Sequence, residues 1–122
     1  MELATERLAS QDLWLGHKTT RRALYDQSRA NLPEGVDELL FLNEREELCE
    51  GTITNLFVTL ATGECVTPPL GAGVLPGILR EVLLETGEVV EKTVTIDDLM
   101  SARSISVGNS LRGQIKAALK QA

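Results

Sequence analysis

The chain has 122 residues, enough for one domain, and its 43% hydrophobic and 25% charged residues favour a packed core over disorder. The net charge of −6 argues against a nucleic-acid-binding surface, and no stretch approaches the ~20 apolar residues that a membrane-spanning helix needs. Two cysteines and one histidine offer no metal-ligand spacing, so we expect no metal site and reduced thiols in a cytoplasmic protein.

The N-terminal half of the chain predicts one long helix and two main strands, with shorter elements around them. A hydroxyl at Thr19 or Thr20 can cap the free amides of a helix that ends at Ala30. β-Branched residues favour a strand over Thr52–Leu60. In chain order, the expected elements are a short helix at 2–9, an anchor or brief strand at 13–15, the long helix, a buried strand at 38–42, a polar turn at 43–47, the strand at 52–60 and a returning hairpin arm at 64–67.

The C-terminal half predicts two helices and two strands. Apolar residues recur at helical spacing between Leu75 and Leu83, and Gly87 suits the position just past the end of that helix. Thr95 with Asp98 resembles a capping box. In chain order, we expect this helix, a strand at 89–94, a short helix at 95–102, a strand at 104–107, a turn at 108–110 and a tail at 114–122 that fits either a strand or a helix.

Lys18, with Arg21 and Arg22 about one helical turn further along, is the first candidate functional residue. Nearby cations lower the pKa of a lysine amine and so favour a nucleophile. A solvated basic face of a helix explains the same residues and is the more frequent arrangement.

An acidic residue and two groups of backbone amides complete the candidate site. Glu50 follows an apolar stretch, and a carboxylate buried there needs a partner such as a ligand cation, although a charge at a hairpin edge is the simpler interpretation. The candidate anion-binding residues are Gly77, Ile78 and Leu79 at a helix start and Asn109 and Ser110 in a turn. Each feature alone carries little weight, but an amine, a carboxylate and two anion cups are together what pyridoxal phosphate requires.

Three motifs resemble the C-terminal domain of the fold-type IV (class IV) pyridoxal-phosphate enzymes, which include branched-chain aminotransferase, D-amino-acid aminotransferase and aminodeoxychorismate lyase. These motifs are LNEREELCEGTITNLFV, TPPLGAGVLPGILR and SISVGNSLRG, and HKTTRRALYD with VGNSLRG is most similar to the lyases. The resemblance implies an α+β fold with a mixed, curled, partly barrel-like sheet and outer helices. Residues 17–122 would form the cofactor-binding domain, and residues 1–16 would be an N-terminal segment, the remnant of a linker.

The same resemblance assigns a role to each candidate residue. Lys18 would bond to the cofactor and move protons at the substrate α-carbon, and Glu50 would pair with the pyridine nitrogen. Asn55 would be a structural residue. Many members carry a threonine where Leu79 stands, so one phosphate hydrogen bond would be lost. The phosphate contacts would come from Gly77, Ile78, Leu79, Asn109 and Ser110.

We expect a lyase that converts 4-amino-4-deoxychorismate to para-aminobenzoate and pyruvate on the path to folate. Two alternatives stay open: transamination of a branched-chain or D-amino acid, which would use the same Lys18 and Glu50, and a non-catalytic half-domain remnant or subunit. Family members carry an N-terminal α/β domain that supplies a phosphate-binding arginine and much of the substrate pocket, and only seventeen residues precede Lys18. We therefore expect that domain to be absent, and a homodimer or an association with the missing domain to cover the surface it leaves.

Overall fold

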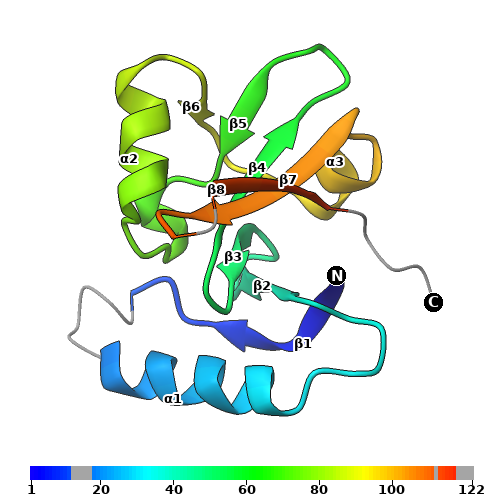
Figure 1. The fold of residues 1–122 in the computed structure, drawn as a ribbon, viewed down its shortest axis with the longest axis vertical. Coiled ribbons are helices and arrows are strands. Elements are labelled where there is room, and N and C mark those ends of the chain that lie inside the picture. Colours follow the sequence, from blue (N-terminus) through cyan, green and yellow to red (C-terminus); the bar gives the residue numbers. More distant parts are fainter. Residues whose placement is uncertain (12–17, 112, 118–122) are drawn as a thin grey trace.

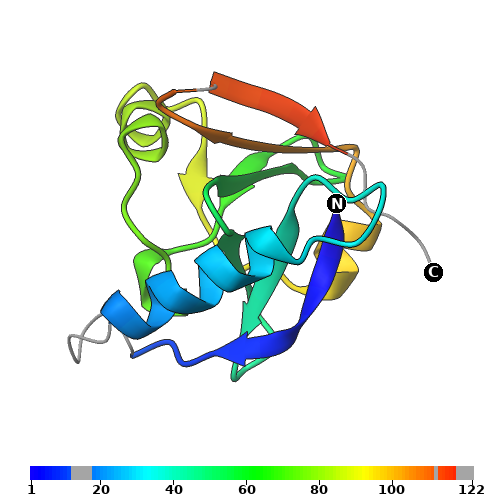
Figure 2. The same cartoon turned by 60° about the horizontal axis from the view of Figure 1, so that its bottom comes forward.

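The structure, a computed structural model, is an α+β fold on an eight-stranded mixed sheet (Figures 1 and 2). It describes residues 1–11, 18–111 and 113–117, with residues 18–20 and 117 described by their backbone alone. The elements are β1 (Glu2–Leu8), α1 (Lys18–Ala30), β2 (Leu39–Asn43), β3 (Leu48–Gly51), β4 (Asn55–Thr59), β5 (Cys65–Thr67), the 3-10 turn η1 (Leu70–Ala72), α2 (Ile78–Glu85), β6 (Val90–Glu91), α3 (Ile96–Met100), β7 (Ser104–Asn109) and β8 (Gly113–Ala117).

The sheet branches at β4. Strands β1 to β6 are neighbours in chain order, while β7 pairs with β4 and β8 pairs with β7. The β1–β2 and β5–β6 pairs are parallel and the others antiparallel. In the part of the chain that the structure describes, the sheet does not close into a barrel, and the helices lie on its outside (Figure 2).

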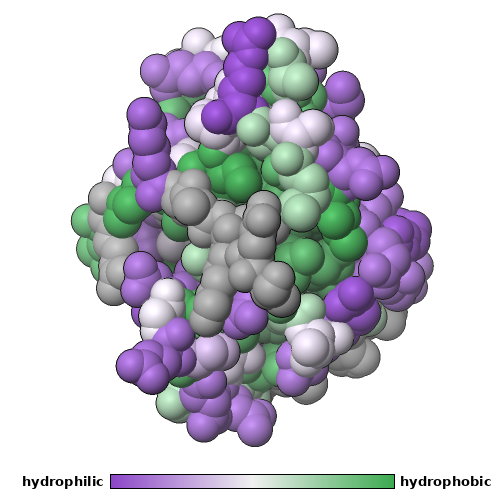
Figure 3. Space-filling view, turned by 90° about the vertical axis from the view of Figure 1, so that its right-hand side faces the viewer, coloured by the Kyte–Doolittle hydropathy of each residue, from purple (hydrophilic) through white to green (hydrophobic). Residues whose placement is uncertain are grey.

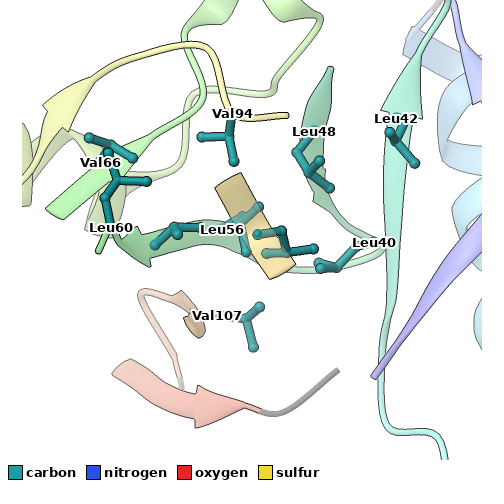
Figure 4. Packing of buried hydrophobic residues seen from close by; sticks show 10 residues of the cluster. Leu40, Leu42, Leu48, Leu56, Leu60, Val66, Val94 and Val107 are labelled. Carbon is teal, nitrogen blue, oxygen red and sulfur yellow. The ribbon is translucent and has the colours of Figure 1, made fainter. Parts of the chain in front are cut away.

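Alternate residues of the central strands supply different apolar clusters. On β2, Leu40 and Leu42 enter the main core, whereas Phe41 contacts the ring of Tyr25 from α1 with centroids 5.0 Å apart. On β4, Leu56 likewise faces the main core. The main core is aliphatic throughout, as the scarcity of aromatic residues predicts (Figure 4); its buried members are Leu40, Leu42, Leu48, Leu56, Val58, Leu60, Val66, Val94, Leu99 and Val107.

One face of the molecule combines polar and apolar side chains. On the face in Figure 3, hydrophilic side chains occupy the outer rim and hydrophobic surface gathers toward the middle. No helix among the described residues is long and apolar enough to cross a membrane.

The structure corrects two predicted elements in the N-terminal half. Residues 2–8 form the strand β1 in place of the expected short helix, because Glu2 and Leu3 pair in parallel with Leu39 and Leu40 of β2. The expected strand at 52–60 is divided: β3 ends at Gly51, residues 52–54 turn, and β4 follows. The helix end at Ala30 and the strand near 38–42 are confirmed, but the helix begins at Lys18, so Thr19 and Thr20 lie within it and do not cap it. The element expected at 13–15 lies outside the described residues.

In the C-terminal half, the capping box of Thr95 and Asp98 is confirmed, and Gly87 has the expected left-handed backbone just past the end of α2. That helix is shorter than expected, because it begins at Ile78, so Leu75 and the residues up to Gly77 form a loop. The turn predicted at 108–110 starts later, since Gly108 and Asn109 still pair with β8. The strand expected at 89–94 is only the two residues of β6, and residues 113–117 of the ambiguous tail form a strand.

Candidate functional site

Five of the seven predicted site residues surround one cavity of about 190 Å³. The cavity lies between the end of β3, the loop before α2 and the end of β7, so it joins segments that are far apart in the sequence. Those five are Glu50, Gly77, Ile78, Asn109 and Ser110. The other two are Leu79, whose side chain packs against the apolar cluster that contains Phe57, and Lys18, whose side chain lies outside the described residues.

Glu50 is a buried carboxylate held by two hydrogen bonds. Its Oε1 accepts from the backbone amide of Leu75 at 2.9 Å, and its Oε2 accepts from the Tyr25 hydroxyl at 2.7 Å. Burial raises the pKa of Glu50 from its ordinary 4.5 to about 7, although both hydrogen bonds oppose this rise. The carboxylate is only 3% exposed, so its charge is costly unless a cation comes to lie beside it.

Tyr25 connects this carboxylate to the helix that begins at Lys18. Residues seven apart lie on nearly the same side of an α-helix, so Lys18 and Tyr25 share a face of α1. Arg21 belongs to the same face and is buried. Sequence reasoning missed Tyr25, although this spacing from Lys18 was a signal that could have found it.

A second buried charge, that of Arg21, lies close to the pair. Its guanidinium donates to the carbonyl oxygens of Gly73 and Ala9 and thereby fixes the loop that leads to Leu75. The positive charge favours the ionised form of Glu50 and so lowers its pKa, which partly offsets burial. Burial also raises the pKa of the Cys49 thiol to about 12, which excludes Cys49 as a nucleophile near neutral pH.

The loop before α2 depends on Asn55. The Asn55 amide donates to the carbonyl oxygen of Leu75 at 3.1 Å, and a Cβ added at Gly77 would overlap Asn55 Oδ1. Gly77 is therefore needed so that the backbone can pass this close to the side chain. Asn55 also lines the cavity, directly opposite Glu50 in the β3–β4 register.

The start of α2 borders the cavity. Gly77 is the N-cap and Ile78 the first helical residue, and the first amides of a helix have no intrahelical acceptor. These amides and the positive end of the helix dipole suit an anion. Leu79 follows them, but its side chain contacts Gly108 and the cluster around Phe57.

Asn109 fixes the turn at the end of β7, which forms one side of the cavity. Its side-chain amide donates to the carbonyl oxygen of Ile53 at 3.0 Å, and its Oδ1 accepts from the backbone amide of Leu111 at 3.0 Å. The exposed Ser110 lies inside this small turn and lines the cavity. Among the described residues, no group of His, Cys, Asp and Glu side chains could hold a metal ion.

Comparison with known proteins adds a family and several relatives. The family model of amino-transferase class IV matches residues 2–118. A structure from Mesorhizobium loti, provisionally described as an amino-acid aminotransferase, is 50% identical with a TM-score of 0.87 and covers 98% of this chain. The aminodeoxychorismate lyase of Saccharomyces cerevisiae is 30% identical over 84% of this chain.

A third relative, from Methanocaldococcus jannaschii, is provisionally described as a branched-chain-amino-acid aminotransferase and is 35% identical over 60% of this chain. All three relatives are longer than this chain. It spans 58% of the Mesorhizobium protein, 32% of the yeast lyase and 27% of the archaeal protein.

Proposed function

Because the chain belongs to the class IV aminotransferase family, we propose that it is the cofactor-binding part of a pyridoxal-phosphate enzyme that acts on an amino-acid-like substrate. The observation that carries the proposal is the position of Glu50, a buried carboxylate in the same cavity as the start of α2 and Ser110. Pyridoxal phosphate carries a protonated ring nitrogen at one end and a phosphate at the other. The Glu50 carboxylate suits the nitrogen, and the positive N-terminal end of α2 suits the phosphate.

The residues of the cavity fit this cofactor at both ends. Within the described part of the chain, each oxygen of Glu50 accepts one hydrogen bond, so the carboxylate keeps lone pairs for a pyridinium nitrogen. A cation at that point would favour the ionised form of Glu50 and bring its pKa down from about 7. At the other end, the amides of Gly77, Ile78 and Leu79 and the Ser110 hydroxyl would hold the phosphate, with Asn109 fixing the turn.

Each residue then has a defined task. When bound, pyridoxal phosphate supplies an electron sink for the charge that develops at the substrate α-carbon. Glu50 holds a proton at the ring nitrogen and so strengthens that sink. Lys18 would provide the amine that bonds to the cofactor and would afterwards accept the proton that leaves the substrate α-carbon. Tyr25 keeps the Glu50 carboxylate in the orientation that this pairing needs.

We propose aminodeoxychorismate lyase as the first candidate activity, supported by the yeast lyase, which aligns over 84% of this chain. The 50% identity to the Mesorhizobium protein favours a second candidate, amino-acid transamination. We further propose that a homodimer partner or a separate N-terminal domain completes the substrate pocket. Assays of para-aminobenzoate release and of keto-acid formation, made with such a domain present, would distinguish the two activities.

The first test is spectroscopic. Pyridoxal phosphate added to the purified chain should produce a visible absorption band, and Lys18→Ala should abolish that band because the amine is gone. Lys92→Ala is the matched control, since Lys92 is exposed and 3.9 Å from Glu64, away from the cavity. If the unaltered chain shows no band, or if the band survives in Lys18→Ala, the proposed cofactor site is wrong and a non-catalytic subunit becomes the better interpretation.

A further inference from the structure

Glu38, which sequence analysis did not single out, accepts hydrogen bonds from all three residues of the turn at 52–54. It is only 5% exposed and lies just ahead of β2. Its Oε1 accepts from the backbone amides of Leu39 at 3.0 Å and Thr52 at 2.9 Å and from the Thr52 hydroxyl. Its Oε2 accepts from the amide of Ile53 at 3.3 Å and from the Thr54 hydroxyl at 3.0 Å.

The sequence around Glu38 and the turn is shaped to these bonds. Gly51 has no side chain at the point where a Cβ would lie 2.6 Å from the Glu38 carboxyl carbon. Arg29 of α1 donates to the Thr52 hydroxyl at 3.1 Å and lies 3.6 Å from Glu38 Oε1, so its charge partly balances the buried carboxylate. A carboxylate that accepts five hydrogen bonds is a stronger anchor than a neutral side chain of the same shape.

The turn that Glu38 holds, residues 52–54, connects both ends of the candidate site. Gly51 alone separates it from Glu50, and Asn55 follows it directly. All three of its residues line the cavity. The carbonyl oxygen of Ile53 accepts from the Asn109 side chain, which in turn fixes the turn that contains Ser110. A displacement of residues 52–54 would therefore shift both Glu50 and the turn that contains Ser110.

We propose that Glu38 is a positioning residue for the cofactor site: it acts through the turn at 52–54 and through Asn109, without touching the cofactor. This inference rests on the proposed function for its second readout only. Its first readout is a property of the chain alone, so a failure of the cofactor proposal and a failure of this one are distinguishable.

The first experiment measures amide hydrogen exchange by NMR in Glu38→Gln. Glutamine keeps the shape but loses the charge and one acceptor oxygen, so the amides of Thr52 and Ile53 should exchange about tenfold faster or more. The Leu111 amide should follow, because its acceptor Asn109 is held by Ile53. Asp37→Asn is the matched control; it removes a neighbouring exposed carboxylate and should leave these amides unchanged.

A purely structural role would give a different pattern. If exchange accelerated equally at core amides such as Leu56, or if Leu111 did not respond, the proposal would be overturned. Thr54→Val is the milder variant, to be used if Glu38→Gln does not fold. It removes one donor from the turn side and should give the same pattern in weaker form.

The second experiment measures the affinity for pyridoxal phosphate by titration of the visible band. Glu38→Gln should weaken binding about tenfold while the band itself keeps its position, because Lys18 is untouched. Asp37→Asn should bind as the unaltered chain does. An unchanged affinity in Glu38→Gln, with normal binding by the unaltered chain, would refute the positioning role even if exchange accelerates.

Discussion

Tyr25 and Glu50 form a buried pair in which a neutral group supports an ionisable one. The sequence indicates Glu50 by its place after an apolar run, yet no local pattern marks the contact of Tyr25 with Glu50 or of Glu38 with the turn at 52–54, because these partners lie at least fourteen positions away. Such partners are fixed by packing between elements, which a local pattern does not encode. At the scale of the residue, then, the sequence predicts the groups with distinctive chemistry but misses those that hold them.

Tyr25→Phe tests this pair. The hydroxyl favours the ionised form of Glu50, so its loss should raise the pKa of Glu50 above the present value of about 7. The variant should lose about 1–3 kcal/mol of unfolding free energy at pH 8, where Glu50 is ionised, and less at pH 5. Urea unfolding at both pH values measures the difference. Thr67→Val, which loses a bond to the neutral carbonyl of Leu56, should show no such pH dependence, and equal losses for Tyr25→Phe at both pH values would contradict the assignment.

At the scale of the element, side chains from elsewhere decide where strands and helices end. The helical pattern of residues 2–9 yields to parallel pairing with β2, and the β-branched run at 52–60 breaks because Glu38 accepts the amides of the turn. The confirmed helix ends, by contrast, depend on nearby residues: Thr95 caps α3 with Asp98, and Gly87 follows α2. Ends set by neighbours in the sequence are predictable, and those set by distant side chains are not.

Gly77→Ala tests the loop before α2. The new methyl group would overlap Asn55 Oδ1, so either the bond from Asn55 to the Leu75 carbonyl breaks or the loop shifts. We expect a loss of about 1–3 kcal/mol in unfolding free energy, measured by urea denaturation. Gly71→Ala is the control, because a Cβ there meets no atom within 4 Å. Equal stability of the two variants would show that Asn55 moves aside freely.

For the molecule as a whole, the sequence predicts the fold class but only part of the topology. The aliphatic core follows from the scarcity of aromatic residues, whereas the α+β class is what the resemblance to the class IV enzymes implies. The branching of the sheet at β4, where three strands pair with one, has no local signature. The branch is nevertheless what brings Asn109 at the end of β7 to Ile53, and so it completes the cavity.

The buried carboxylate should affect the stability of the entire molecule. Its folded pKa of about 7 lies above the ordinary 4.5, so its favourable contribution is complete below pH 4.5 and is lost as pH rises to 7. Between pH 4.5 and 7, the unfolding free energy of the unaltered chain should fall by on the order of 3 kcal/mol relative to that of Glu50→Gln, which stays neutral. Unfolding free energies of both proteins at several pH values give this difference. The exposed Glu85→Gln should track the unaltered chain, and parallel pH profiles for Glu50→Gln would mean that Glu50 is not buried in solution.

The cavity is divided among distant stretches that meet through the β3–β4 and β4–β7 pairings and the packing of α1. Long-range pairings of this kind close slowly, because each must first overcome the entropy of a large loop. A refolding chain therefore acquires its binding pocket only when its overall architecture is complete. The time at which the refolding chain first binds its ligand would then report the last step of assembly.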